Sequence, residues 1–253
     1  MRKLPEPFLH SKRHHKVYRV MIMGKRYYGI YLVAIALSLV LIFGTDRVAE
    51  TMSQSWQVPR DRCIVLDAGH GGVDGGAVSC TGHSESDINL EIALRLEALF
   101  ELMGYDTRMI RSEDISIHTK GDTIAQKKVS DLKERVRIVN ETPGGILISI
   151  HQNTFRDSQY SGAQVFYAQT EGSQEMAEHV QQRLGYALDP TNDRKCKPSN
   201  GVYLMDNIKC TGILIECGFL SNLKEEAMLR DAQYQKKLSV SIVTAVCCLL
   251  NGA

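Results

Sequence analysis

Short apolar runs alternate with segments of helical periodicity through residues 61–253. Nearly continuous apolar runs lie at 63–66, 145–150 and 213–216, and such runs are typical of strands that are buried on both faces. Residues 105–110 and 163–167 predict two further strands. Strands that alternate with helices predict a single layered α/β domain with a central, mostly parallel β-sheet flanked by helices.

Helical spacing of apolar residues predicts the helices between these strands. The first helix has Gly104 as its C-cap, and its buried positions are Ile88, Ile92, Leu96, Leu99 and Met103. Further helices are expected at 132–140, at 174–188 and around Leu238 to Leu249, with the second of these ending before Pro190. The polar segments 112–130 and 189–201 are predicted to be loops.

An uncharged apolar segment at residues 27–44 precedes this domain. Its 18 residues are at the lower limit for a transmembrane helix, and three tyrosines lie at its basic end, where an aromatic belt is expected. A buried core helix and a cleaved signal peptide are the alternatives. We predict a basic cytoplasmic tail (1–26), an uncleaved anchor (27–44), a tether (45–60) and an extracytoplasmic domain (61–253), because basic flanks stay in the cytoplasm.

Charge and cysteine content narrow the classes of function. The 253-residue chain has a formal net charge of +1, and eight Lys or Arg precede residue 27, so the remainder is net acidic and nucleic acid is not an expected partner. The seven cysteines are odd in number and form no C-x-x-C pair. A complete disulfide framework is therefore excluded and a structural zinc knot is not expected; we interpret most of them as buried small apolar residues.

Three of the predicted strands end on residues that can act at a metal: His70, His151 and Glu216. The carboxyl ends of strands are where sites form in open α/β sheets. A catalytic zinc takes three protein ligands and leaves a fourth position open. His70 and His151 supply two nitrogens, and the third ligand is expected before the first helix, where Glu85, Asp87 and His83 all occur. His118 and His179 lie in polar stretches and are predicted to be surface residues.

Other sites built on glycine or serine are not supported. The glycine-rich segment 69–76 (GHGGVDGG) matches neither the dinucleotide fingerprint nor the phosphate-binding loop with its lysine. The sequence contains no G-x-S-x-G, so a serine hydrolase of that type is not indicated. The pattern of residues alone leads as far as a metal-dependent hydrolase.

Four blocks in the same order resemble the zinc-dependent N-acetylmuramoyl-L-alanine amidases often called amidase 3. They are 66–72 (LDAGHGG), Glu85 before a helix, 149–153 (SIHQN) and 215–222 (IECGFLSN). Segments 119–121 (TKG), 131–136 (DLKERV), 161–164 (SGAQ) and 201–205 (GVYLM) make the chain most similar to the sporulation- and germination-specific members. Ser86 stands where the family often has lysine.

The resemblance implies His70, Glu85 and His151 as zinc ligands and Glu216 as the catalytic carboxylate. It implies hydrolysis of the amide between N-acetylmuramic acid and L-alanine in peptidoglycan, which prepares δ-lactam formation in spore cortex. The alternatives are an inactive wall-binding or regulatory module and another zinc wall hydrolase, a carboxypeptidase or deacetylase. The catalytic domain is expected on the extracytoplasmic side of the membrane, which in a developing spore is the intermembrane space. The sequence does not identify an activating protein partner.

Overall fold

The computed structural model describes residues 61–252. The predicted tail (1–26), anchor (27–44) and tether (45–60) lie outside these residues. Within 61–252, no helix combines the length and the hydrophobicity that a membrane span needs.

A six-stranded sheet forms the centre of the domain. Its strands are β1 (Cys63–Ala68), β2 (Asp106–Met109), β3 (Gly145–Asn153), β4 (Gln164–Tyr167), β5 (Lys197–Pro198) and β6 (Gly212–Phe219). They lie in the order β2-β1-β3-β6-β4-β5. All neighbours are parallel except β4 and β6. The mostly parallel α/β sheet predicted from the sequence is therefore confirmed, and it is mixed because of this one antiparallel pair.

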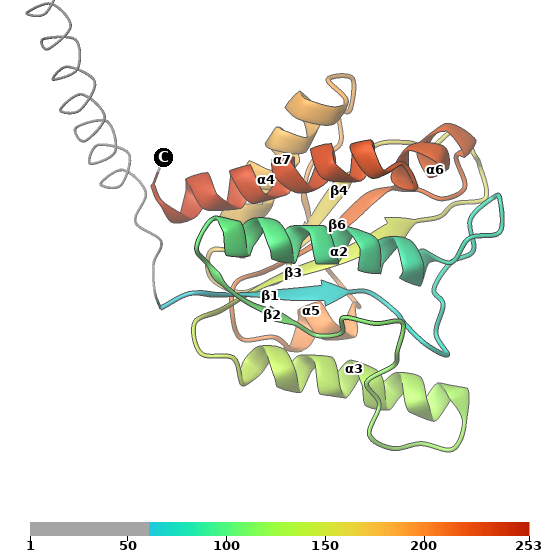
Figure 1. Cartoon of the computed structure of the whole chain (residues 1–253), viewed down its shortest axis with the longest axis vertical. Helices are drawn as coiled ribbons and strands as arrows, with labels where there is room; N and C mark the ends of the chain where they lie inside the picture. Colours follow the sequence, from blue (N-terminus) through green and yellow to red (C-terminus); the bar gives the residue numbers. More distant parts are fainter. Residues whose placement is uncertain (1–60, 253) are drawn as a thin grey trace, which may run out of the picture. The chain divides into compact units, whose positions relative to one another are not determined.

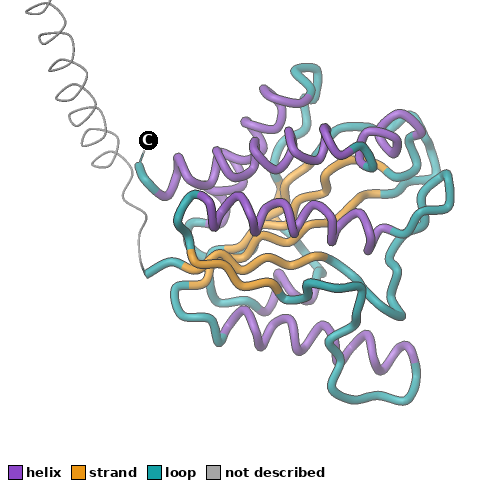
Figure 2. Tube along the Cα trace, in the orientation of Figure 1, coloured by secondary structure: helices purple, strands orange, loops and turns teal. Residues whose placement is uncertain are grey.

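Helices cover both faces of the sheet (Figures 1 and 2). They are α2 (Glu85–Leu102), α3 (Ile124–Asn140), α4 (Ser173–Leu188), α5 (Tyr203–Asn207), α6 (Leu223–Leu229) and α7 (Ala232–Leu250). Helix α7 packs against both α2 and α4 along one face, and α3 and α5 pack together on the other. The chain passes from β1 to β2 on one side and then to β3 on the other, so right-handed crossovers place α2 and α3 on opposite faces.

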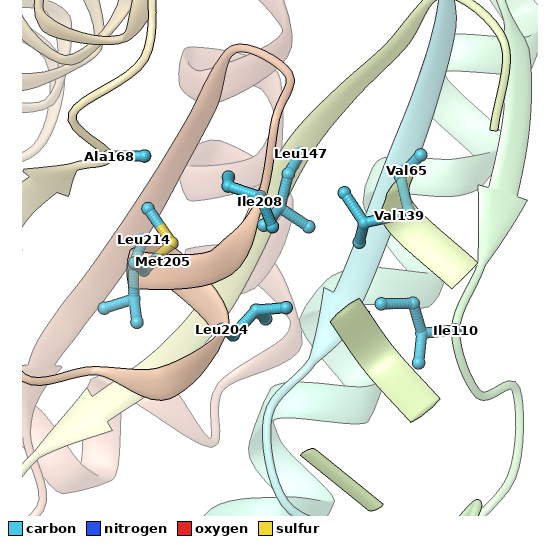
Figure 3. Packing of buried hydrophobic residues seen from close by; sticks show 9 residues of the cluster. All are labelled: Val65, Ile110, Val139, Leu147, Ala168, Leu204, Met205, Ile208 and Leu214. Carbon is cyan, nitrogen blue, oxygen red and sulfur yellow. The ribbon is translucent and has the colours of Figure 1, made fainter. Parts of the chain in front are cut away.

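The central strands are buried on both faces, which explains their continuous apolar runs. Val65 of β1 and Leu147 of β3 pack against Val139, Leu204 and Ile208 in the cluster under α3 and α5 (Figure 3). Their neighbours along each strand point to the opposite face, where α2 lies. A side chain on either face is thus removed from water.

Several predicted boundaries were wrong. Helix α3 begins at Ile124 rather than 132, because Thr123 and Gln126 form a capping box that starts a polar, exposed first turn without apolar periodicity. Strands β3 and β6 continue past residues 150 and 216. The short elements β5, α5 and α6 were not predicted, since they are too short to show a period.

The interpretation of most cysteines as buried was also wrong. Only Cys217 and Cys247 are buried, Cys80 is exposed, and the other four are half-buried. All seven lie among the described residues and none forms a disulfide. Burial raises the pKa of the Cys217 and Cys247 thiols, so these two side chains behave as small apolar groups.

A buried ion cluster joins α3 to the end of β1. The guanidinium of Arg135 contacts the carboxylates of Asp67 and Asp131, and it donates to the carbonyls of Ala68, at 3.0 Å, and His70, at 2.6 Å. Burial opposes the charge of Asp67, but Arg135 holds the pKa of that carboxyl below its usual range. The cluster therefore fixes the backbone that leads out of β1.

We expect Arg135→Leu to lower the free energy of unfolding by about 3–5 kcal/mol at pH 7, because it leaves a buried carboxylate uncompensated. Arg137→Leu, on the exposed side of the same helix, should leave the free energy of unfolding nearly unchanged, because water and salt screen an exposed ion pair. Urea unfolding measures both. The deficit of Arg135→Leu should narrow below about pH 4, where Asp67 of the unfolded chain takes up a proton. Equal effects of the two substitutions would contradict the role of the cluster.

Candidate active site at the strand ends

The sequence-predicted residues meet at the carboxyl edge of β1, β3 and β6. His70 follows β1 by two residues, while His151 lies within β3 and Glu216 within β6. His151 and Glu216 are direct partners across the two strands. Strand β1 lies between β2 and β3, so the chain turns to opposite sides of it, which is where ligand sites form in such sheets.

The sequence predicted that His151 and Glu216 end their strands. In the structure both residues lie inside their strands. The pairing shifts after them: His151 pairs with Glu216, but Asn153 pairs with Phe219, so β6 has one extra residue. An extra residue forms a bulge, which turns nearby side chains. The sheet can therefore continue past both residues while it presents them at its edge.

His70, Glu85 and His151 form the one potential metal-binding cluster found in residues 61–252, with ligand atoms within 4.8 Å of one another. Oε2 of Glu85 lies 3.3 Å from Nε2 of His70, and Oε1 lies 3.0 Å from Nδ1 of His151. Two imidazoles and a carboxylate are a donor set of catalytic zinc sites. The open choice of third residue is thereby narrowed, because His83 and Asp87 are exposed and outside the cluster.

Glu85 is the first residue of α2 and is buried. Its carboxylate accepts hydrogen bonds from the backbone N–H of Ala77, at 2.9 Å, and of Gln152, at 3.2 Å. Burial disfavours its charge, but hydrogen bonds to His151 and His70 hold its pKa far below the usual range. In turn, burial lowers the pKa of His70, and Glu85 and Asp74 outweigh this and raise it. The Glu85 carboxylate is therefore held as an anion between the two histidines.

Asp74 supports His70 and was missed in the sequence. Its Oδ2 lies 3.0 Å from Nδ1 of His70 and 3.0 Å from Nζ of Lys128 in α3. A carboxylate on one imidazole nitrogen fixes the ring and leaves the other nitrogen free as a ligand. Here the free nitrogen, Nε2, faces Glu85. The spacing of four residues from His70 gave no sign of this contact, because the turn is irregular.

The loop that carries His70 is packed against the cluster without spare room. A Cβ at Gly69 would lie 2.2 Å from Cε1 of His151, and one at Gly76 would lie 2.6 Å from Oε2 of Glu85. His70 itself has φ +63°, a strained value for a non-glycine residue. The buried Arg111 donates to the carbonyls of Ala68, Gly69 and Ser86, which holds the loop and α2 together.

Glu216 is the fourth residue of the site. Its Oε2 is buried and has no hydrogen-bond partner among the described residues. Burial raises its pKa to about 7, with His151 lowering and Glu85 raising it. A buried carboxylate oxygen without a partner is uncommon in a folded protein. An unpartnered oxygen of this kind is expected where a carboxylate binds a cation or a proton during the reaction.

Comparison with known proteins gives one consistent family. The profile of the N-acetylmuramoyl-L-alanine amidase family matches residues 64–248. The germination-specific N-acetylmuramoyl-L-alanine amidase of Bacillus subtilis is 37% identical over 194 residues, which are 76% of this chain and 81% of that protein.

Solved structures agree with this. The CwlD amidase of Clostridioides difficile, solved in complex with the GerS lipoprotein, superposes with a TM-score of 0.71 at 39% identity and covers 73% of this chain and 96% of its own. An N-acetylmuramoyl-L-alanine amidase from Clostridium difficile 630 has a TM-score of 0.65 at 28% identity, with 74% and 96% covered.

We expect Gly69→Ala to weaken the binding of added zinc to this cluster by at least about tenfold, because the added methyl group displaces the His151 ring and misplaced ligands cost affinity on this scale. Gly185→Ala is the matched control, since the nearest atom to a Cβ added at this helical glycine would be the carbonyl oxygen of Asn192, at 3.8 Å. Competition with a chromogenic chelator measures both affinities. Unchanged affinity in Gly69→Ala would show that the ring does not need this space.

Proposed function

The chain belongs to the N-acetylmuramoyl-L-alanine amidase family, and we propose that it is a zinc-dependent member whose product serves the spore cortex. The substrate bond is the amide that joins the lactyl carboxyl of N-acetylmuramic acid to the L-alanine of the stem peptide. The observation that carries the proposal is the His70–Glu85–His151 cluster beside the unpartnered carboxylate of Glu216.

Zinc fits the residues that meet here. His70, Glu85 and His151 would hold it, which leaves a fourth position for water or substrate. A zinc ion in such a site supplies Lewis acidity, which polarises a carbonyl and makes water a better acid. The chain supplies the rest: Asp74 orients His70, and backbone N–H groups orient the carboxylate of Glu85.

Glu216 is the proton carrier in this proposal. Its carboxylate takes a proton from the attacking water and gives it to the departing nitrogen of L-alanine, so that one side chain is general base and then general acid. A buried carboxyl with a raised pKa can do both near neutral pH. The unpartnered Oε2 is the oxygen that is free to hold this proton.

The product explains the link to spores. Hydrolysis frees the carboxyl group of muramic acid. Once the acetyl group is removed from the amine on the sugar ring, a later step can join this amine to the freed carboxyl group as a δ-lactam. The germination-specific name of the B. subtilis relative supports this assignment. Mass analysis of digested peptidoglycan separates the alternatives: released stem peptides indicate an amidase, a lost terminal residue a carboxypeptidase and lost acetate a deacetylase. No change would indicate an inactive wall-binding module.

We expect His70→Ala, Glu85→Ala and His151→Ala each to lose zinc, because each leaves two protein ligands. His179→Ala, on the exposed side of α4, and Asp87→Ala should keep it. Elemental analysis of purified protein measures zinc per chain. Full zinc in any of the first three variants, or its loss in Asp87→Ala, would refute this ligand set.

Glu216→Gln keeps the shape of the side chain but cannot accept the proton. We expect zinc and fold to be retained and amide cleavage to fall by roughly 10²–10⁴-fold, the usual size of a general acid–base contribution. Release of stem peptides from peptidoglycan, followed by mass spectrometry, measures the rate. Near-normal turnover would remove Glu216 from the mechanism, and loss of zinc would make it a ligand.

The location of the domain is a separate part of the proposal: residues 27–44 anchor the chain and residues 61–253 lie outside the membrane. Protease added to intact protoplasts should therefore remove the domain and leave a short membrane-bound stub, as detected with an N-terminal tag. Recovery of a secreted domain that starts near Thr45 would show that the segment is a cleaved signal peptide.

A further inference from the structure

Two aromatic rings of the loop that follows β3, Phe155 and Tyr160, gather with Phe219, the last residue of β6. The rings of Phe155 and Tyr160 are perpendicular, with centroids 4.9 Å apart, and Tyr160 stacks on Phe219 at 6.3 Å. Phe219 is buried, whereas Phe155 is 56% exposed and Tyr160 is 42% exposed. The loop thus presents two aromatic side chains to solvent on a buried aromatic base.

The polypeptide holds this aromatic cluster in place. The side chain of Asn222 donates to the carbonyls of Ser158, at 2.9 Å, and Tyr160, at 3.3 Å. The N–H of Phe155 donates to Oγ of Ser221 at 3.1 Å. Arg194 lies over the ring of Phe219, 4.8 Å from its centroid. Aromatic side chains held in place and left in water indicate a surface that a ligand covers.

The cluster continues the edge that carries the active site. Phe155 follows His151 by four residues, and Phe219 follows Glu216 by three. At the rise of a strand, four residues span at most about 13 Å. The cluster therefore lies at the same end of the sheet as the active site.

We propose that the aromatic cluster of Phe155, Tyr160 and Phe219 is a binding platform for the sugar chain of peptidoglycan, a proposal that rests on the proposed function. A pyranose ring has an apolar face of C–H groups, which packs on the electron-rich face of an aromatic ring. The platform therefore holds the glycan side of the scissile amide.

The test measures binding of two peptidoglycan fragments to the full-length protein: a peptide-free tetrasaccharide of the glycan chain and a free stem peptide. Phe155→Ala should weaken binding of the tetrasaccharide by about three- to tenfold, the effect of one lost aromatic contact, and raise KM for polymeric peptidoglycan. Phe155→Tyr should restore binding. Tyr186→Ala is the matched control, because this exposed tyrosine of α4 has its ring paired with Arg183 and not with the three rings of the cluster.

Three results would overturn the platform: unchanged tetrasaccharide binding in Phe155→Ala, equal weakening in Tyr186→Ala, or weakened binding of the stem peptide alone. Retention of binding by Phe155→Leu would equally contradict it, because an aliphatic side chain lacks the aromatic face. A cluster that instead docks a protein partner or a second copy would give unchanged sugar binding and a change in assembly mass. Cleavage by a wild-type protein that binds no tetrasaccharide would overturn the platform alone, whereas sugar binding without cleavage would overturn the proposed amidase mechanism alone.

Discussion

The carboxylate of Glu85 is the constraint on which the site depends. A buried carboxylate is costly unless charges and hydrogen bonds compensate it. Here the compensation comes from two separate parts of the chain: the connection between β1 and α2, with His70 and Ala77, and strand β3, with His151 and Gln152. Helix α2 must begin where these parts meet. The site is therefore complete only when β1, β3 and α2 are packed together.

The residues around Glu85 fix the positions of His70 and His151 without a metal ion. Arg111 and Arg135 bind the carbonyl groups on either side of Gly69, and the lack of a side chain there lets the ring of His151 pass. The strain at His70 is compatible with this design, because the carbonyl of that residue is itself held by Arg135. The proposed zinc would then need little rearrangement of the chain to bind, which favours affinity.

The sequence predicted the fold class and a set of site residues that the structure brings together, because buried parallel strands have continuous apolar runs and functional residues collect at their carboxyl ends. From the sequence, Glu85 could be separated from Asp87 and His83 only by resemblance to a family, since all three lie within five residues at the start of the first helix. Asp74 and the extra residue in β6 could not be predicted, because an irregular turn and a bulge leave no period. The early start of α3 depends on a cap, Thr123 with Gln126, and not on apolar spacing.

The most direct test of this account is the position of the metal in crystals of the zinc-loaded protein, located by anomalous scattering at the zinc absorption edge. The account predicts one peak at about 2.0–2.2 Å from one nitrogen of His70, one nitrogen of His151 and an oxygen of Glu85, with the carboxylate of Glu216 close by but not bound to it. A peak coordinated by Glu216 in place of Glu85, or a fully loaded crystal without a peak at this cluster, would contradict it.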